Sequence, residues 1–148
     1  MRLISFFLIL IFLSFFTVND IYSQGKVEVI VENFKYDDGN LLITIYRDAK
    51  GFPDNPKDRD VAIIDKVEMV DGKIHWTSPE LPYGVYAISL LDDKNKNFEM
   101  DYSWGFPQEG FGFSNNAKPR LWKPPTFDDA KFVLNKPVKT LNVRLQFL

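Results

Sequence analysis

The chain has 148 residues, contains no cysteine and carries a formal net charge of −2. Lysines and carboxylates are interleaved along it, so the basic stripe that a nucleic-acid-binding protein needs is missing. A fold held together by disulfide bonds is also excluded, because no cysteine is present to form them. We therefore predict a domain that depends on its hydrophobic core and has no nucleic-acid partner.

Residues 1–23 predict a secretory signal peptide. Arg2 precedes an apolar run from Leu3 to Phe16, and a polar tail ends in the small residue Ser23. The run has about fourteen residues, whereas a helix that spans a bilayer needs roughly twenty. An uncleaved N-terminal anchor is the alternative. Cleavage after Ser23 leaves residues 24–148 as a single domain, which we expect to be periplasmic or secreted and to have no membrane span.

The mature chain alternates apolar and polar residues, which is the pattern of half-buried β-strands. Asp38-Gly39 and Asp71-Gly72 stand between such runs and predict tight hairpin turns. Short strands at spacings near ten residues predict an all-β fold, an immunoglobulin-like or transthyretin-like β-sandwich of about seven strands. The strands that the alternation marks most clearly cover residues 26–34, 40–48, 61–70, 73–78, 81–93 and 139–148.

Residues 93–127 interrupt this frame with a long segment that shows no sustained alternation. Loops beyond about fifteen residues are uncommon in compact domains and tend to be functional or disordered. This segment is rich in aromatic residues, unlike disordered chains, so we predict one long, folded loop rich in aromatics, glycine and proline. Gly105, Gly110 and Gly112 are expected to allow turns with positive φ. A single helical turn over residues 126–130 should begin with a threonine cap.

The order of motifs in this segment resembles a known family. A strand ends in an Asp- and Asn-rich loop, and Gly-x-Pro-x-Glu-Gly-x-Gly-Phe-Ser-Asn-Asn and then Pro-Pro-x-Phe-x-Asp-Ala follow it. The chain thereby resembles the bacterial exported family catalogued as domain of unknown function 2141, over essentially the whole mature chain. The resemblance implies an exported bacterial protein and brings no assigned activity. The residues that carry it are Gly105, Pro107, Glu109, Gly110, Gly112, Phe113, Ser114, Asn115, Asn116, Pro124, Phe127, Asp129 and Ala130.

The loop after residue 92 is a candidate calcium site. Calcium takes six to eight oxygen ligands, and side-chain oxygens at alternate positions of a loop can turn toward one centre. Phe98 stands at the sixth position, where the sharp turn favours glycine, and Trp104 at the twelfth, where a bidentate glutamate would sit. The alternative is an Asx-rich turn whose side chains cap their own backbone. The candidate ligands, at positions one, three, five and nine, are Asp93, Asn95, Asn97 and Asp101.

The aromatic segment itself has two interpretations. In the first it is structural: Phe111, Phe113 and Phe127 cover one end of the sandwich, while neighbouring polar side chains satisfy buried backbone groups. In the second it forms a binding face for a sugar, a peptide or an envelope partner, because loops on rigid β-scaffolds often carry function. The candidate ligand-binding residues are Trp104, Glu109, Phe113, Asn115, Asn116 and Trp122.

Catalytic motifs are weak. His75 is the single histidine, and Ser114 lacks the Gly-x-Ser-x-Gly frame of a nucleophile elbow. Carboxylate pairs such as Asp128 with Asp129, or Glu109 with Asp101, could serve a glycosidase, but surface carboxylates are common. We therefore expect an accessory or binding module of the bacterial envelope, with an envelope protein or a glycan as its partner. The alternative is a weak calcium-dependent carbohydrate-binding or hydrolytic envelope protein.

Overall fold

The structure is a computed structural model that describes residues 23–53, 60–120 and 123–148. The predicted signal peptide lies outside the described residues except for Ser23, and it stays a prediction. Within these ranges no helix has the length and apolar character that a membrane crossing requires.

The first sheet is built around β1 (Gln24–Glu32). β1 pairs in parallel with β11 (Val138–Arg144) on one side and antiparallel with β4 (Lys73–Thr77) on the other. The short β5 (Leu81–Pro82) also pairs with the start of β1. The inward-facing residues of β1 alternate with partly exposed ones, so the predicted strand and its core face are confirmed.

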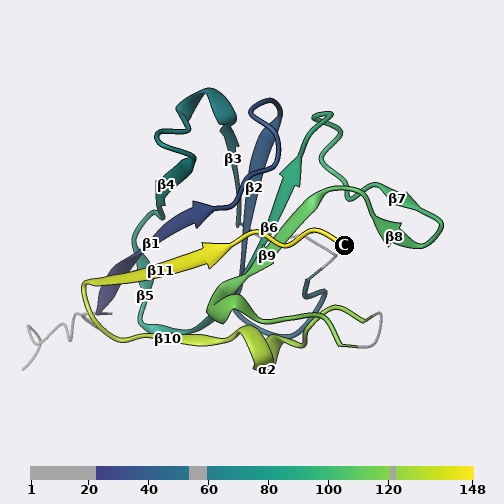
Figure 1. Ribbon diagram of the computed structural model, residues 1–148. Coiled ribbons are helices and arrows are strands. Elements are labelled where there is room, and N and C mark those ends of the chain that lie inside the picture. Colours follow the sequence, from purple (N-terminus) through teal and green to yellow (C-terminus); the bar gives the residue numbers. More distant parts are fainter. Residues whose placement is uncertain (1–22, 54–59, 121–122) are drawn as a thin grey trace, which may run out of the picture.

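The second sheet is built around β6 (Gly84–Asp93). One edge of β6 pairs with β2 (Asn40–Tyr46), which pairs in turn with β3 (Asp60–Asp65). The other edge is shared: β10 (Phe132–Leu134) pairs with the first part of β6, and β9 (Gly110–Phe113) pairs with its last part. The two sheets face each other (Figure 1), which confirms the all-β, sandwich-like fold.

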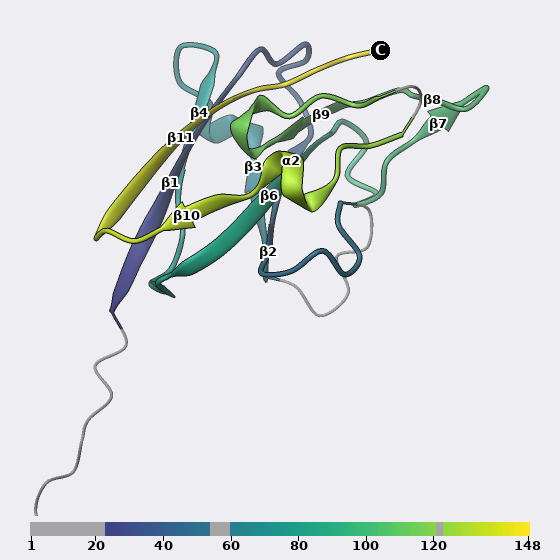
Figure 2. The same cartoon turned by 90° about the horizontal axis from the view of Figure 1, so that it is seen from below.

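Four shorter elements complete the described chain. The 3-10 helix η1 (Lys66–Glu68) follows β3, and η2 (Ser114–Asn116) follows β9. β7 (Tyr102–Ser103) and β8 (Phe106–Pro107) form a small hairpin that projects from the body of the molecule (Figures 1 and 2).

The helix α2 (Phe127–Ala130) lies against β6 and η2, as Figure 2 shows from below. Thr126 Oγ1 accepts a hydrogen bond from Asp129 N at 3.3 Å, and Asp129 Oδ2 accepts one from Thr126 N at 3.0 Å. This reciprocal capping box confirms the predicted helical turn and its threonine cap.

Both predicted hairpins are wrong in topology. Asp71 and Gly72 adopt the left-handed conformation of a tight turn, but they close only the single bridge between Val70 and Lys73. Gly39 also has a positive φ of 96°, yet β1 and β2 belong to opposite sheets. Local turn chemistry was recognised correctly, but the chain uses these turns to pass from one sheet to the other, because the inner apolar faces of the two sheets are buried against each other.

The space between the sheets holds the inner core, a cluster composed mainly of aliphatic side chains. Alternate residues of β1, β2, β6 and β11 contribute to it, as a period of two requires. The members that are fully buried and largest include Val27, Val29, Val31, Ile43, Ile88, Leu134, Val143 and Leu145.

A second cluster, the outer cluster, lies on the opposite face of the β6–β9 sheet. Ala87 points into it while the next residue, Ile88, points into the inner core. Phe52 is its centre, with ring centroids 5.0 Å from Tyr46 and 6.0 Å from both Phe113 and Phe127. The cluster comprises Ala87, Phe111, Phe113, Ala117 and Ala130, with Phe52, Met100 and Phe127 packed against them.

Strand β9 explains the Gly-Phe-Gly-Phe run, and it corrects two predictions. Residues 93–127 are not one irregular loop, since β9 pairs along β6 in the middle of them. Gly110 and Gly112 do not have positive φ; among the three glycines expected to do so, only Gly105 does, at 83°. A Cβ at Gly112 would lie 3.0 Å from Val143 Cγ1, so this glycine lets the facing sheet approach closely. Phe111 and Phe113 alternate with the glycines and fill the outer cluster.

Candidate functional site

The four candidate calcium ligands lie together in the loop that follows β6. Asp93 ends β6 and is fully buried. Its Oδ1 accepts a hydrogen bond from Asn97 N at 3.2 Å, and its Oδ2 accepts one from Phe98 N at 3.0 Å. Both carboxylate oxygens therefore hold the loop closed on itself, as in the Asx-turn interpretation.

Asp101 joins the two asparagines of this loop. Asn95 Nδ2 donates to Asp101 Oδ2 at 2.6 Å, and Asn97 Nδ2 donates to Asp101 Oδ1 at 3.0 Å. The amide oxygens accept backbone N–H groups instead, Asn95 Oδ1 from Asn97 N and Asn97 Oδ1 from Glu99 N. The structure thus brings all four side chains together, with amide N–H groups satisfying the charge of Asp101.

Phe98 adopts a left-handed conformation with φ of 66°. Glycine is favoured at such a position because it has no Cβ to clash there. Phe98 stands at the sixth position of the loop, where the sharp turn of a calcium loop favours glycine. The Phe98 side chain is about half exposed and takes no part in either apolar cluster.

Glu109 lies beneath the loop and not among the aromatic rings. Its Oε1 accepts a hydrogen bond from Lys94 N at 2.8 Å, and its Oε2 accepts one from Asp101 N at 3.3 Å. Burial raises the pKa of Glu109 above its ordinary value, and the two backbone donors oppose this rise. Glu109 was a ligand-binding candidate. The structure places it where it joins the two ends of the loop formed by residues 93–101, which we call the Asx loop.

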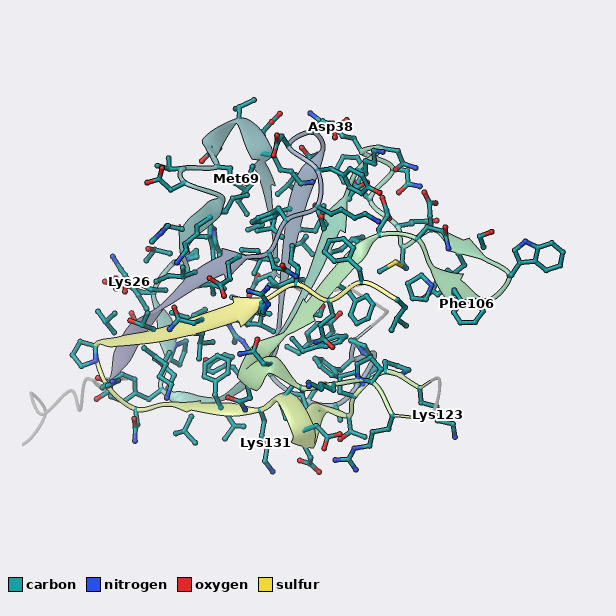
Figure 3. All side chains as sticks on the ribbon, in the orientation of Figure 1. Lys26, Asp38, Met69, Phe106, Lys123 and Lys131 are labelled. Atoms are coloured by element: carbon teal, nitrogen blue, oxygen red, sulfur yellow. The ribbon has the colours of Figure 1, made fainter. Side chains whose placement is uncertain are left out.

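Among the residues that the structure describes, the hairpin β7–β8 carries the most exposed aromatic side chain. We call residues 102–107 the aromatic finger. Trp104 is 97% exposed at its tip, and Tyr102 and Phe106 also expose large parts of their rings. Phe106 lies on this projecting hairpin in Figure 3. The finger is anchored at its base, where Gln108 N donates to Asp101 O at 2.8 Å.

The other aromatic-segment candidates have contacts within the fold. Phe113 is buried in the outer cluster. Asn115 Nδ2 donates to Lys131 O at 2.7 Å and to Ala130 O at 3.2 Å. Asn116 Oδ1 accepts from Arg144 N at 2.8 Å. These residues act as the structural interpretation expects, whereas Trp122 lies outside the described residues.

A shallow, open hollow lies along the end of β11 and the C-terminal residues that follow it. It has a volume of about 690 Å³. Asn116 is the one candidate ligand-binding residue that borders it. The other lining residues are Glu32, Asn33, Lys118, Asn142, Arg144, Leu145, Gln146, Phe147 and Leu148.

The carboxylates considered for hydrolysis are engaged in the fold. Asp129 caps α2 and pairs with Arg120 at 2.7 Å, while Asp128 pairs with Lys131 at 2.8 Å. Hydrogen bonds from the backbone and side chain of Thr126 lower the pKa of Asp129. Across the described ranges no three His, Cys, Asp or Glu side chains are grouped so as to hold a metal ion.

A buried ion pair was not recognised from the sequence. Lys66 Nζ contacts Asp92 Oδ1, and both side chains are fully buried. Asp92 continues the inward face of Ile88 and Leu90, which is the signal that could have found it. Lys66 gave no such signal, because η1 ends the strand predicted over residues 61–70 and changes the direction of its side chains.

Comparison with known protein families places the chain in one of them. A family model described as an uncharacterized protein conserved in bacteria (DUF2141) matches residues 29–142. No curated protein and no solved structure matches the chain significantly. The matched range covers most of both sheets, the Asx loop, the aromatic finger and the outer cluster. This chain therefore belongs to the bacterial DUF2141 family.

Proposed function

We infer that this protein is an exported binding module of the bacterial envelope, and that the aromatic finger is its contact element. The observation that carries this proposal is Trp104, an indole left almost wholly in water at the tip of a projecting hairpin. Tryptophan and tyrosine combine a large apolar ring with a polar group, and they are enriched where proteins bind partners.

The backbone at the tip supports the same proposal. Trp104 and Gly105 both have positive φ, 53° and 83°. Glycine, asparagine and aspartate fit such a turn more easily than tryptophan does, because a large side chain is strained there. The fold therefore holds a bulky ring at a position where its backbone conformation lowers the stability of the protein. This is expected of a residue that contacts a binding partner.

The anchored base of the finger favours binding in a second way. The Glu109 carboxylate accepts hydrogen bonds from Lys94 N and Asp101 N, and Gln108 N donates to Asp101 O, so the base of the hairpin is joined to the end of β6. An element that is already ordered loses less conformational entropy when it binds. Flat exposed rings with carboxylates and amides beside them suit a glycan, whose sugar rings offer both an apolar C–H face and hydroxyl groups.

The test is binding of the mature protein to a glycan array and to purified peptidoglycan sacculi. We expect Trp104→Ala to lose most of the binding. Val67→Ala is the matched control, because Val67 is also highly exposed but lies on η1, away from the finger. Binding that survives Trp104→Ala, or that falls equally in Val67→Ala, would contradict the proposed contact.

A divalent cation in the Asx loop is a second candidate, favoured by the convergence of its four side chains. Rotation of the Asn95 and Asn97 amides would turn their oxygens toward Asp101 and a bound cation, which is the donor set that calcium prefers. The ion would then order the loop from which the finger projects. The more specific proposal is therefore that the aromatic finger binds carbohydrate and that calcium in the Asx loop strengthens this binding.

Thermal melts in calcium and in chelator test this candidate. A ligand at a hundredfold excess over its Kd stabilises the folded state by about 2.7 kcal/mol, so the melting temperature should rise by several degrees. Magnesium should do less, because it demands a tighter octahedral shell. The calcium shift should vanish in Asp101→Asn and persist in Asp128→Asn; melts that do not respond to calcium would leave the loop as an Asx turn.

A further inference from the structure

The buried pair of Lys66 and Asp92 lies at one end of the inner core. Lys66 is the first residue of η1, where the chain leaves the second sheet for the first. Asp92 is the second-last residue of β6, opposite Leu41 of β2 and Gly110 of β9. Both side chains have no exposed surface, and Lys66 Nζ contacts Asp92 Oδ1.

Aromatic rings enclose the pair. Lys66 Nζ lies 5.6 Å from the centroid of the Phe34 ring, and it donates a hydrogen bond to Tyr36 O at 3.1 Å. A Cβ at Gly110 would lie 3.0 Å from Asp92 Cβ and 2.7 Å from the Phe147 ring. Gly110 therefore allows Phe147 to approach Asp92, and bulk water is kept from the carboxyl group.

The hydrogen bonding of Asp92 is incomplete. Within the described part of the chain, neither carboxylate oxygen has a partner with hydrogen-bond geometry. A buried carboxylate normally accepts several hydrogen bonds, and each group left without them needs an explanation. The amine thus touches the carboxyl group without being aligned as an ordinary donor to it.

We propose that Lys66 and Asp92 react with each other to form an intramolecular amide bond between Lys66 Nζ and Asp92 Cγ. One ammonium proton passes to the carboxylate, and the neutral amine attacks Cγ. The C–N bond forms, the C–O bond to one oxygen breaks, and this oxygen leaves as water with the transferred proton and a second proton from nitrogen. The ammonium and carboxylate groups contain every atom of the amide and the water, so no other reactant is needed.

The interior favours this reaction in two ways. The two reacting groups are held in contact, which replaces a bimolecular encounter by an effectively unimolecular step. Burying a charged pair away from water carries a desolvation cost that its mutual attraction repays only with good geometry and additional hydrogen bonds. The amide has no charge, so its formation removes this cost and expels the water that could reverse the reaction.

The cross-link would act as a disulfide does in other exported proteins. It would join the start of the crossover between the sheets to the end of β6, and it would close a loop containing β4, β5 and most of β6. A covalent closure of this kind reduces the freedom of the unfolded chain. This chain has no cysteine, and the amide would give it a covalent cross-link that reduction cannot break.

The test is the intact mass of the purified mature protein after full denaturation. We expect a mass lower than that of the sequence by one water molecule, and fragmentation that joins Lys66 to Asp92. The Lys66→Arg variant keeps the positive charge but removes the nucleophilic amine, and it should have the full mass. A wild-type chain with the full mass would overturn the proposal, whether or not the variant folds.

A second source of the same mass change must be separated. Asp38-Gly39 and Asp71-Gly72 can also lose water by forming succinimides. Succinimides open in mild alkali and would persist in Lys66→Arg, whereas the proposed amide survives mild alkali and is absent from this variant. A loss of water that mild alkali reverses, or that remains in Lys66→Arg, would therefore contradict the Lys66–Asp92 bond.

Discussion

The inner core and the outer cluster lie on opposite faces of the same sheet, and they are built by different means. Aliphatic residues from regular strands of both sheets fill the inner core. Phenylalanines from the short strand β9, from the loop at Phe52 and from the start of α2 fill most of the outer cluster. The first cluster follows from strand periodicity alone, whereas the second needs polar side chains to hold irregular backbone against the sheet.

Ser114 is the clearest of these polar side chains. It is fully buried; its Oγ accepts from Ile88 N at 2.9 Å and donates to Ala130 O at 2.6 Å. The hydroxyl thereby connects β6 to the end of α2. Irregular segments leave backbone groups that no ladder pairs, so a buried aromatic cluster built from them depends on such bridges.

The largest expected loss of folding stability comes from removing a ring from the outer cluster. Phe113→Ala removes a buried ring and should lower the free energy of unfolding by about 3–5 kcal/mol. Ile88→Ala, the matched change in the inner core, should cost about 2–5 kcal/mol. Denaturant unfolding followed by both fluorescence and circular dichroism measures the two. If Phe113→Ala leaves the midpoint unchanged, the outer cluster is not part of the cooperative fold.

A smaller loss of folding stability is expected when the Ser114 hydroxyl, which bridges β6 and α2, is removed. Ser114→Ala leaves Ile88 N and Ala130 O buried without this partner, which costs about 1–3 kcal/mol. Ser103→Ala, in the exposed β7, is the control and should be close to neutral. Equal unfolding midpoints for the two variants would show that the outer cluster does not need its polar bridge.

The smallest effect concerns the cap that positions α2 over the outer cluster. Hydrogen bonds from the backbone and side chain of Thr126 hold the pKa of Asp129 below its ordinary value of 3.8. Asp129 therefore contributes stability above this value, and the contribution is lost as the pH falls through the lower pKa of the folded state. Asp129→Asn should be slightly less stable than wild type at pH 7 and equal to it in strong acid.

The control for this prediction is Asp128→Asn, which removes the same charge one residue earlier without touching Thr126. Chemical denaturation over a pH series separates the two variants. A constant difference between Asp129→Asn and wild type at every pH would mean that the ionised cap contributes nothing.

Much of the fold could be predicted from local pattern. Alternation located β1, β2, β4, β6 and β11, and the Thr126 cap located α2, because these signals depend on neighbouring residues. Strand partners could not be predicted in this way. Asp38-Gly39 has the chemistry of a hairpin turn, yet β1 pairs with β11 and β4, since burial of both apolar faces decides the pairing.

The candidate site was predicted in part. The spacing of Asp93, Asn95, Asn97 and Asp101 correctly grouped four side chains in one loop. Glu109 was a ligand-binding candidate, and it was also considered as a partner of Asp101. It lies under that loop and accepts backbone N–H groups, because pairing of β9 with β6 carries residue 109 back to residue 93. Trp104 was named as a candidate ligand-binding residue, and the structure leaves its ring in solvent.

The sequence by itself determined the strands that alternate clearly, the turns at Gly39 and Gly72, and the threonine that caps α2. These features depend on period, backbone conformation and side chains a few positions apart. Only the tertiary structure decided that phenylalanines of β9 face outward while its glycines face the inner core. It also brought Lys66 and Asp92 together, because a contact between residues that are distant in the chain is set by the packing of the two sheets.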